Sequence, residues 1–542
     1  MEAGRGGRLL VPELVLAGGA WRRGWAVLLR APDPQTGDVA VAWAGPEQEA
    51  RELPAAEGAE VVLLGGRAVA PGFVNAHSHA FQIALRGRGE CYERRGIRAF
   101  TSPPAPGTGG NFWSWREEMY GLVGSIDAAE MKRRCLQAFR EMLQAGITCV
   151  GEFHYLHHPT EAAGGEPGAA EGCTYELDDV VIEAAEEANI RLVLLCTHYD
   201  LSGFGGAPVE GPQRRFFSPS ADRLVTRLDE LHLQATGVPT DATGVVGGRF
   251  GDRRVTFGIA AHSLRATGLP DLVSLSAAAI SRRLKLHVHL EEQTAEVDAC
   301  KQKHGGATPM RLLLDSLDED LTHVTAVHCT HSDPAELAEF VRRGGRVCVC
   351  PATEGALGDG IPPLGGSEVQ QAAAERIAPP RATAGTTLSG SADCWVCLGT
   401  DCNASIDFQA EMRWLEYGQR LRFRRRGVLL DLAPPPEAAT RAETGAGAAG
   451  SVSWQLFQAA TLGGAQSLGV RAGAVEAGLL ADFCVLDLGN PLLREAAGGD
   501  APNLPAERLL DLLAFAGSEA AICAAWVNGR EAWGRATGAA AA

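Results

Sequence analysis

Short apolar runs that end in polar or ionisable residues recur along the chain. The first leads from Phe73 to His77 and His79, and seven more follow it. These runs are too short for helices and lack the strict alternation of a half-exposed strand, so they predict strands buried on both faces of a parallel sheet. The seven later runs are Thr148–Tyr155, Arg191–Tyr199, Val255–Leu264, Leu284–Glu292, Val324–His331, Arg346–Thr353 and Trp395–Asp401.

Helix-like stretches fill several intervals between these runs, including Ala128–Ala145, Thr294–Leu317 and Pro334–Arg343. Eight buried strands that alternate with helices predict a (β/α)8 TIM-type barrel, whose chemistry lies where the strands end. A single histidine there is most simply structural, but ionisable residues at so many strand ends favour one shared pocket. They are His77, His79, Glu152, His154, His198, His262, His289, Glu292, His328, Glu354 and Asp401.

The two ends of the chain share a pattern. Short extended stretches separated by turn residues occupy residues 8–70, and a similar series occupies residues 475–535. Two β-rich segments that flank a barrel are expected to meet as one small domain. We therefore predict a β-sandwich built from residues 1–70 and 471–542, and a metal-dependent hydrolase barrel over residues 71–470.

Four segments interrupt this organisation and are interpreted as insertions with little functional content. The last begins with three consecutive prolines and is low in complexity, a composition typical of a segment without a packed core. The third precedes the run that ends at Asp401 and is the one placed to shape a lid or a subunit contact. The four segments are 162–172, 236–253, 365–392 and 434–451.

Composition narrows the class of protein. A chain of 542 residues, 46% of them hydrophobic, can bury a barrel core and a second domain. The net charge of −17 argues against nucleic acid and anionic membranes as partners. No apolar stretch reaches the length of a membrane span, the N-terminus lacks a signal-peptide core, and the cysteines show no paired metal-binding spacing. A cytoplasmic enzyme with reduced thiols is expected.

A metal site is predicted where the strands end. His77 and His79 stand two residues apart, so in a strand both imidazoles lie on one face, although such a pair alone is a weak signal. His289 and Asp401 end the fifth and eighth predicted strands, and a closed barrel brings distant strand ends together. Three imidazoles and a carboxylate suit one catalytic zinc ion that keeps a position for water.

A hydrolytic zinc site also needs a group that moves protons. Glu291 and Glu292 both follow the predicted ligand His289 closely, and spacing alone does not choose between them. His328 ends the sixth predicted strand and is placed to polarise or orient the electrophile. Asp401 is a further candidate for proton transfer besides its place among the ligands.

These motifs resemble the amidohydrolase superfamily in its single-metal deaminase branch. The resemblance implies zinc bound by the four predicted ligands, and catalytic roles for Glu292, His328 and Asp401 rather than for Glu291 or His331. The similar segments are His77-Ser-His79, His289-Leu-Glu291-Glu292, His328-Cys-Thr-His331 and Gly399-Thr-Asp401.

A narrower resemblance, to the formimidoylglutamate deiminase family, extends from about residue 70 to residue 425. It implies hydrolysis of N-formimidoyl-L-glutamate to N-formyl-L-glutamate and ammonia, a step of histidine degradation, and a homodimer with one zinc ion per subunit. The similar segments are Phe112–Tyr120, Glu152–His158, Ser202–Gly206, Gln213–Phe216, His262–Arg265 and Arg413–Leu421.

The same resemblance implies which residues bind this dianionic substrate. Arg116, Arg265 and Tyr155 would bind the carboxylates, a task to which fork-shaped guanidinium groups are suited. Gln82 and His262 would hold and orient the substrate near the metal. The alternative for each arginine is an exposed solubilising charge, and the placement of Arg265 just after a strand-end histidine favours the binding role.

Alternatives stay open on two points. Gly355, in the segment after the seventh predicted strand, stands where the family pattern carries asparagine. Two other functions also compete: a deaminase of the same superfamily acting on a purine-like or other amidine substrate, and a non-catalytic homologue. The aromatic and arginine motifs argue against the first, and the retained ligands and acid/base group argue against the second.

Overall fold

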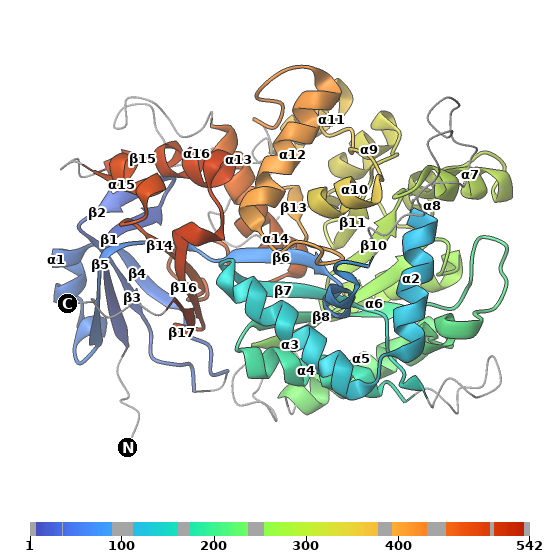
Figure 1. Ribbon diagram of the computed structural model, residues 1–542, viewed down its shortest axis with the longest axis horizontal. Coiled ribbons are helices and arrows are strands. Elements are labelled where there is room, and N and C mark those ends of the chain that lie inside the picture. Colours follow the sequence, from blue (N-terminus) through green and yellow to red (C-terminus); the bar gives the residue numbers. More distant parts are fainter. Residues whose placement is uncertain are drawn as a thin grey trace.

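The chain folds into a barrel and a smaller sheet domain that lie side by side (Figure 1). The computed structural model describes residues 7–34, 36–88, 112–160, 174–236, 254–377, 393–430, 451–498 and 503–535. The predicted insertion 162–172 lies outside these ranges, as do all but one residue each of 236–253 and 434–451.

Eight parallel strands form the barrel, in the order β13-β12-β11-β10-β9-β8-β7-β6, so strands adjacent in the chain are adjacent in space. The first and last strands meet at a bridge between Ser78 and Asp401. The predicted eight-stranded barrel is therefore confirmed. The strands are β6 (Phe73–Ser78), β7 (Ile147–His154), β8 (Arg191–His198), β9 (Val255–Ser263), β10 (Leu286–Leu290), β11 (Val324–His328), β12 (Arg346–Val349) and β13 (Val396–Leu398).

The continuous apolar runs of the sequence are explained by where the strands lie. Every residue of β6, β7, β8, β10, β11, β12 and β13 is buried. Inward side chains fill the barrel and outward ones pack under the helices, so neither face needs polar residues. The polar residues that do occur at the strand ends are therefore exceptions that need partners.

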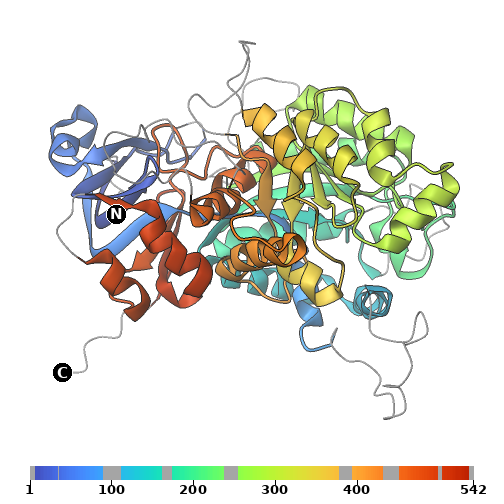
Figure 2. The ribbon, with the colours of Figure 1, turned by 90° about the horizontal axis from the view of Figure 1, so that it is seen from above.

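Helices cover the barrel on its outside (Figure 2). Side-chain caps begin several of them; Asp127, for example, accepts a hydrogen bond from the main-chain N–H of Glu130 at the start of α3. The helices are α2 (Phe112–Ser125), α3 (Ala128–Gln144), α4 (Glu176–Ala188), α5 (Ala221–Thr236), α6 (Leu269–Arg282), α7 (Thr294–Lys303), α8 (Pro309–Ser316), α9 (Pro334–Arg342), α10 (Pro351–Leu357), α11 (Ser367–Ile377), α12 (Phe408–Phe423), α13 (Val452–Gln458) and α14 (Gly464–Leu468).

Two helical segments differ from the sequence prediction. The predicted helix-like stretch 294–317 is two helices, because Gly305 and Gly306 adopt φ values of 63° and 100° between α7 and α8, and Pro309 begins the second helix. The segment 365–392, interpreted as an insertion, begins with helix α11, which packs against α9. That part is a barrel helix, and residues 378–392 lie outside the described ranges.

The two ends of the chain meet, as predicted, in a second, mixed sheet beside the barrel (Figure 2). Its main path runs β15-β2-β1-β5-β14-β16-β17, with β3 paired to β1 and β4 paired to β3. The elements are β1 (Arg8–Ala17), β2 (Ala20–Arg23), β3 (Trp25–Leu29), β4 (Val41–Pro46), β5 (Glu60–Pro71), β14 (Phe483–Asp487), β15 (Asn503–Pro505), β16 (Ile522–Val527), β17 (Arg530–Gly534), α1 (Glu47–Glu52), α15 (Pro491–Ala497) and α16 (Ala506–Ala516).

A buried ion pair joins this sheet domain to the barrel. Arg191, the first residue of β8, contacts Asp482, which precedes β14, through Nε and Oδ2 at 2.6 Å and through Nη2 and Oδ1 at 3.1 Å. Each side chain is only 2% exposed. Asp482 also accepts a hydrogen bond from the N–H of Asn528 at 2.7 Å. Both parts of the chain are therefore fixed to the same carboxylate.

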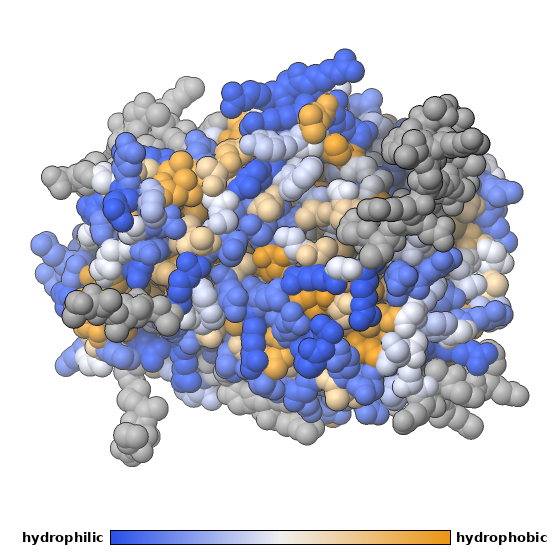
Figure 3. Space-filling view, in the orientation of Figure 1, coloured by the Kyte–Doolittle hydropathy of each residue, from blue (hydrophilic) through white to orange (hydrophobic). Residues whose placement is uncertain are grey.

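The surface agrees with the burial of the apolar runs. On the face drawn in Figure 3, hydrophilic residues cover most of the area and hydrophobic ones lie in small separate groups. Helix α12 carries three exposed hydrophobic side chains, those of Trp414, Tyr417 and Leu421. Among the described residues, none of the helices combines the length and the apolar character needed to cross a membrane.

Candidate metal centre and active site

Four buried side chains converge where the barrel closes. His77 and His79 end β6, His289 lies in β10, and Asp401 follows β13. The distances to Asp401 Oδ1 are 3.3 Å from His77 Nε2 and 3.2 Å from His79 Nε2. His289 Nε2 lies 3.1 Å from His77 Nε2. One potential ligand atom from each of the four residues lies within 4.8 Å of all the others.

This donor set fits a zinc ion. Ligands placed about 2.0 to 2.1 Å from a tetrahedral zinc lie about 3.3 Å from one another, close to the observed separations. Hydrogen bonding alone does not account for the cluster. His79 Nδ1 donates to a carbonyl oxygen, so in the neutral tautomer the lone pair of Nε2 faces Asp401 Oδ1. A cation between the four groups satisfies all of them.

The protonation states also suit a cation. Burial lowers the pKa of His77 to about 3, and burial holds the pKa of His289 well below its usual value. For Asp401, burial acts to raise the pKa, but the neighbouring side chains of His77 and His79 outweigh it and hold the pKa well below the usual range. His77 and His289 are therefore neutral, and Asp401 is a carboxylate anion.

Main-chain carbonyl groups orient the imidazoles from behind. His79 Nδ1 lies 2.9 Å from the carbonyl oxygen of Phe153, and His289 Nδ1 lies 2.8 Å from that of His262. A proton on each Nδ1 leaves Nε2 free to bind a metal, as is usual for metal-binding histidines. The barrel strands themselves thus fix the tautomers that the site needs.

A polar network closes the barrel beneath the metal cluster. Asn75 donates to Thr400 Oγ1 at 2.7 Å and accepts from the N–H of Thr400 at 3.0 Å. Asn403 donates to Ser78 Oγ at 3.1 Å. At Gly399 a Cβ atom would lie 2.7 Å from the Cβ of His77, so glycine is required for this close approach. Asn75 and Asn403 had no assigned role in the sequence prediction.

The candidate acid/base groups lie on one side of the metal cluster. His328 Nε2 is 3.8 Å from Glu292 Oε1 and 3.9 Å from Asp401 Oδ2. On the other side of the ring, Nδ1 lies 3.3 Å from Glu354 Oε1, and Glu354 is itself held by the N–H of Cys350 at 3.0 Å. Glu354 thus orients His328.

Electrostatics separates the roles of these two groups. Burial acts to lower the pKa of His328, but Glu292, Glu354 and Asp401 outweigh it and raise the pKa to about 10, which favours the imidazolium. The pKa of Glu292 is raised, mainly by burial, although His328 and Arg265 oppose the change. A raised pKa makes a carboxyl group better suited to both accepting and releasing a proton.

Backbone conformation decides between Glu291 and Glu292. Glu291 adopts a left-handed φ of 56°, which turns the two neighbouring side chains in different directions. Glu291 accepts a hydrogen bond from the N–H of Met310 at 2.9 Å, whereas Glu292 lines the pocket beside the metal cluster. His328 likewise lines the pocket and His331 does not. Glu292 and His328 therefore face the pocket, and their catalytic roles stay a prediction from the family resemblance.

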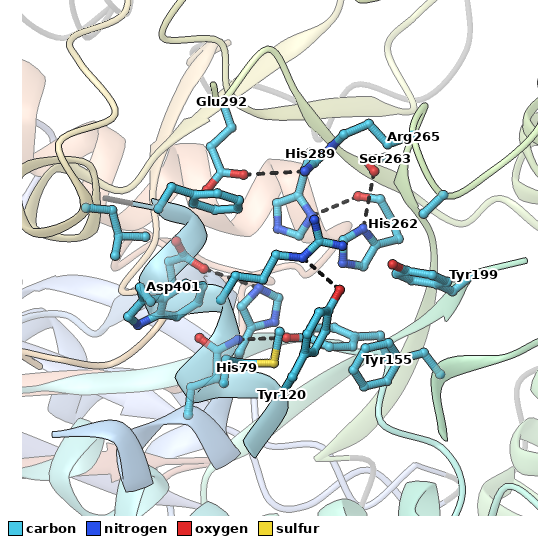
Figure 4. Close-up of a pocket in the computed structure, with 18 of the residues that line it drawn as sticks. His79, Tyr120, Tyr155, Tyr199, His262, Ser263, Arg265, His289, Glu292 and Asp401 are labelled. Atoms are coloured by element: carbon cyan, nitrogen blue, oxygen red, sulfur yellow. Dashed lines mark hydrogen bonds and ion pairs between the residues drawn. The ribbon is translucent and has the colours of Figure 1, made fainter. Parts of the chain in front are cut away.

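A pocket opens over the metal cluster, with a volume of about 680 Å³ including its mouth. Figure 4 shows its labelled residues around one space, with His79, His289 and Asp401 near Glu292. Ten of the eleven predicted site residues line this pocket, and the eleventh, His77, is fully buried behind them. The ten are His79, Gln82, Arg116, Tyr155, His262, Arg265, His289, Glu292, His328 and Asp401.

The predicted substrate-binding residues have definite partners. Gln82 donates to the hydroxyl of Tyr155 at 2.7 Å. Arg116 Nε donates to the hydroxyl of Tyr120 at 2.7 Å. Arg265 lies beside Glu292, with 3.6 Å between Nη2 and Oε2. Two guanidinium groups therefore face a pocket whose inner end is the metal cluster.

Sequence reasoning missed several pocket residues. Tyr120, Tyr199 and Gln213 form a chain in which the amide of Gln213 donates to both hydroxyls, at 3.1 and 2.8 Å. Tyr199 follows β8 as Tyr155 follows β7, a parallel that the sequence contains. Phe112 and Phe216 supply apolar wall. Their motifs were recognised without a role for these individual side chains.

Some strand-end residues do not share the pocket, and for His198, Glu152 and Glu354 this is contrary to the prediction of one shared pocket. Successive residues of a strand point to opposite faces, so part of the set turns outward. His154 Nε2 lies 3.1 Å and His157 Nδ1 lies 2.8 Å from Asp178 Oδ1, and Arg227 also contacts Asp178. His198 is fully buried outside the pocket. Glu152 and Glu354 do not line the pocket either. Each accepts a hydrogen bond from a main-chain N–H group, that of Ala80 and that of Cys350 respectively.

Gly355 is not one of the residues that line the pocket. It lies in α10, and a Cβ atom there would meet no described atom within 4 Å. Neighbouring Glu354 keeps its contacts with His328 and Cys350. Position 355 therefore has open space beside it, and the contacts of Glu354 are complete with glycine there.

Comparison with known proteins places the chain in a family. A model of the Amidohydrolase family matches residues 68–531. Formimidoylglutamate deiminase of Pseudomonas aeruginosa is 35% identical over 475 residues, which cover 88% of this chain and 86% of that protein. The crystal structure of an amidohydrolase from Brucella melitensis is 27% identical, with a TM-score of 0.70 and coverage of 97% of this chain and 94% of that one.

An adenosine deaminase from Xanthomonas campestris, solved with bound zinc, has the same fold. It is 20% identical, with a TM-score of 0.64 and coverage of 97% of this chain and 92% of that one. The matched family region includes all four residues of the metal cluster. The chain therefore belongs to the amidohydrolase family.

Proposed function

We propose that this protein is a zinc-dependent deiminase that hydrolyses N-formimidoyl-L-glutamate to N-formyl-L-glutamate and ammonia, in the cytoplasmic degradation of histidine. The observation that carries the proposal is that Arg116 and Arg265 line the same pocket as the cluster of histidines and aspartate. A pocket with two guanidinium groups suits a substrate with two carboxylates. The 35% identical Pseudomonas aeruginosa enzyme supports the same substrate.

The pocket divides into a binding part and a reacting part. Arg116, Arg265 and the hydroxyl of Tyr155 bind the glutamyl carboxylates, while Gln82 and His262 orient the chain of the substrate. Tyr155 is 3% exposed and Gln82 is 2% exposed, so both lose little freedom when the substrate binds. The formimidoyl group then lies towards the metal cluster.

The reacting part supplies a site for a Lewis-acidic metal ion and side chains that transfer protons. His77, His79, His289 and Asp401 would hold a zinc ion, which would supply Lewis acidity and lower the pKa of a bound water. Glu292 takes a proton from the attacking water and delivers it to the terminal amidine nitrogen, and the remaining proton of that water follows from the new hydroxyl group to the same nitrogen. The bond from carbon to that nitrogen breaks, ammonia leaves, and the formyl oxygen comes from water.

His328 and Asp401 complete this route. The imidazolium of His328 stabilises negative charge that develops beside the reacting carbon, because its Nε2 faces the pocket while Glu354 holds Nδ1. Asp401 lies 3.9 Å from the same Nε2 and is a second relay for the proton. The homodimer implied by the family resemblance stays a prediction.

A coupled ammonia assay with a panel of substrates tests the proposal. The panel contains N-formimidoyl-L-glutamate, a formimidoyl amine without carboxylates, and guanine, each given to zinc-loaded protein. Ammonia release from the first at a kcat/KM at least about a hundredfold above the others is expected, because each unpaired arginine costs binding energy. Release from guanine alone contradicts the proposal, and binding of the first without release indicates a non-catalytic homologue.

A further inference from the structure

Arg265 stands between two carboxylates in the absence of substrate. Its Nη2 lies 3.6 Å from Glu292 Oε2, and its Nε lies 3.6 Å from Glu296 Oε1. Figure 4 shows the first of these contacts at the edge of the pocket. Arg265 and Glu292 both line the pocket, whereas Glu296 does not. The guanidinium is therefore shared between a group that faces the substrate and one that lies behind it.

Glu296 is buried completely, with a side chain 0% exposed. It occupies the first turn of α7, four residues after Glu292, and its Oε2 accepts a hydrogen bond from the N–H of Glu292 at 3.1 Å. Its Oε1 has no hydrogen-bond partner among the described residues. A buried carboxylate without a nearby cation is unfavourable, and Arg265 is the cation that Oε1 faces.

A purely structural role explains the position of only one of the two carboxylate oxygens of Glu296. A glutamate at the third position of a helix commonly accepts a hydrogen bond from the main chain just before the helix, and Oε2 does so here. The other oxygen contributes nothing to that cap. Its position against the guanidinium of Arg265 needs a separate reason, which the chemistry of the pocket supplies.

We propose that Glu296 is a positioning residue that holds Arg265 for the substrate and keeps it from being captured by the acid/base carboxylate. When a substrate carboxylate binds Arg265, it replaces Glu292 as the partner, and Glu296 remains behind the guanidinium as the second anion. Glu292 is then released towards the reacting nitrogen. Recognition of the carboxylate and readiness of Glu292 are thereby linked through one side chain.

The identity of the substrate in this inference rests on the proposed function, but the link itself concerns any carboxylate in the pocket. Without Glu296, the guanidinium has Glu292 as its remaining close carboxylate and pairs with it more strongly. Both the binding of substrate and the availability of Glu292 then decline. The effect of removing Glu296 must therefore pass through Arg265.

A double-mutant cycle on zinc-loaded protein tests this link. The variants are Glu296→Gln, Arg265→Met and the two combined, with Asp298→Asn as the control because Asp298 is exposed on the same helix. We expect Glu296→Gln to lower kcat/KM for N-formimidoyl-L-glutamate by about tenfold to a hundredfold, the range typical of residues that orient a functional side chain. The combined variant should be no worse than Arg265→Met. Losses that multiply, or a Glu296→Gln variant equal to the control, overturn the proposal.

A stability measurement gives a second readout that activity does not enter. Arg265→Met leaves the buried Glu296 without its cation, so its thermal midpoint should fall, and adding Glu296→Gln should restore part of the loss. A combined variant less stable than Arg265→Met contradicts the proposal. If Glu296→Gln does not fold, Glu296→Asp, which keeps the negative charge, replaces it in the cycle. Its activity should be higher than that of a variant with an uncharged residue at position 296.

Calorimetric binding of glutarate separates this inference from the proposed function. If the protein releases no ammonia from N-formimidoyl-L-glutamate but binds glutarate, with a Kd raised by Glu296→Gln and raised alike by Arg265→Met and by the combined variant, the function fails and the role of Glu296 stands. If ammonia is released but glutarate binding is unchanged in Glu296→Gln, the function stands and the role of Glu296 fails. Absence of glutarate binding in the unmodified protein counts against both.

Discussion

His79 and Asp401 are joined twice, once through their main chains and once through their side chains. The N–H of His79 donates to the carbonyl oxygen of Asp401 at 2.8 Å, and His79 Nε2 lies 3.2 Å from Asp401 Oδ1. The first contact closes the barrel between its first and last strands, and the second belongs to the metal cluster. Closure of the barrel and assembly of the metal site are therefore one structural event.

Removal of the metal is accordingly expected to destabilise the whole barrel. A ligand present at a hundred to a thousand times its Kd stabilises the folded state by about 3 to 4 kcal/mol, which corresponds to a shift of several degrees in the thermal midpoint. Calorimetry with and without a chelator measures it. The variant His289→Asn, which lacks one ligand, should show a smaller response to chelator, and an unchanged midpoint in the unmodified protein contradicts the link.

Glu292→Gln and Arg265→Met should separate chemistry from binding. Loss of the proton carrier is expected to lower kcat by about 10² to 10⁴ with little change in KM. Loss of the guanidinium is expected to lower kcat/KM for N-formimidoyl-L-glutamate mainly through KM. Steady-state ammonia release measures both. Glu291→Gln, which keeps an acceptor for the N–H of Met310, should leave kcat unchanged, and a loss there equal to that of Glu292→Gln shows the assignment to be wrong.

Glu354→Gln tests the residue behind His328. The substitution keeps an acceptor for the N–H of Cys350 but removes the charge that helps to raise the pKa of His328. We expect kcat to fall by about tenfold to a hundredfold, with KM and zinc content unchanged. Glu368, exposed at the start of α11, provides the control as Glu368→Gln. A loss of zinc in place of a loss of kcat shows that Glu354 supports the metal cluster instead.

Asp482→Asn should weaken the junction between the barrel and the terminal sheet. It leaves Arg191 buried without a full countercharge, a change that costs about 3 to 5 kcal/mol. Urea denaturation measures the free energy of unfolding. Glu60→Gln, which breaks the exposed ion pair with Arg8, should cost less than about 1 kcal/mol. Equal costs for the two variants contradict the importance of burial at this junction.

Acid should weaken the cluster around Asp178. Burial acts to raise the pKa of Asp178, but His157 and His154 outweigh it and hold the pKa below its usual range. Such a carboxylate stabilises the fold above the unfolded-state pKa of about 3.9, and this stabilisation is lost as the pH falls. The cost of Asp178→Asn in urea denaturation should therefore be largest at pH 7 and shrink by about 1.4 kcal/mol per pH unit below about 3.9. A cost that is constant from pH 7 to pH 3 contradicts this.

The strands of the barrel were predictable because burial on both faces leaves a plain signature. The run from Arg191 was predicted to end at Tyr199 and ends as β8 at His198, and the run before Asp401 contains β13. The break at Gly305 and Gly306 was not predicted, since a helix and two helices joined by left-handed glycines share nearly the same apolar spacing. The same difficulty hid helix α11.

Individual side-chain directions were less predictable than the membership of the site. His154 and His262 both come from strand ends, yet His154 contacts Asp178 on the outside while His262 lines the pocket. The face on which a strand-end residue lies changes with a shift of a single residue. Spacing left Glu291 and Glu292 open and the family resemblance implied Glu292, while the left-handed φ of Glu291, which only the structure shows, is contained in no spacing rule.

By itself, the sequence determined that the chain forms an eight-stranded barrel and that His77, His79, His289 and Asp401 are candidates for one metal site, because strand length and residue chemistry are local properties. Only the tertiary structure decided that His79 and Asp401 close the barrel, that Glu354 lies behind His328 and that Glu296 shares Arg265 with Glu292. These relationships depend on register, on backbone turns and on burial. All three arise only when distant segments pack together, since a charge needs its partner in space and not in sequence.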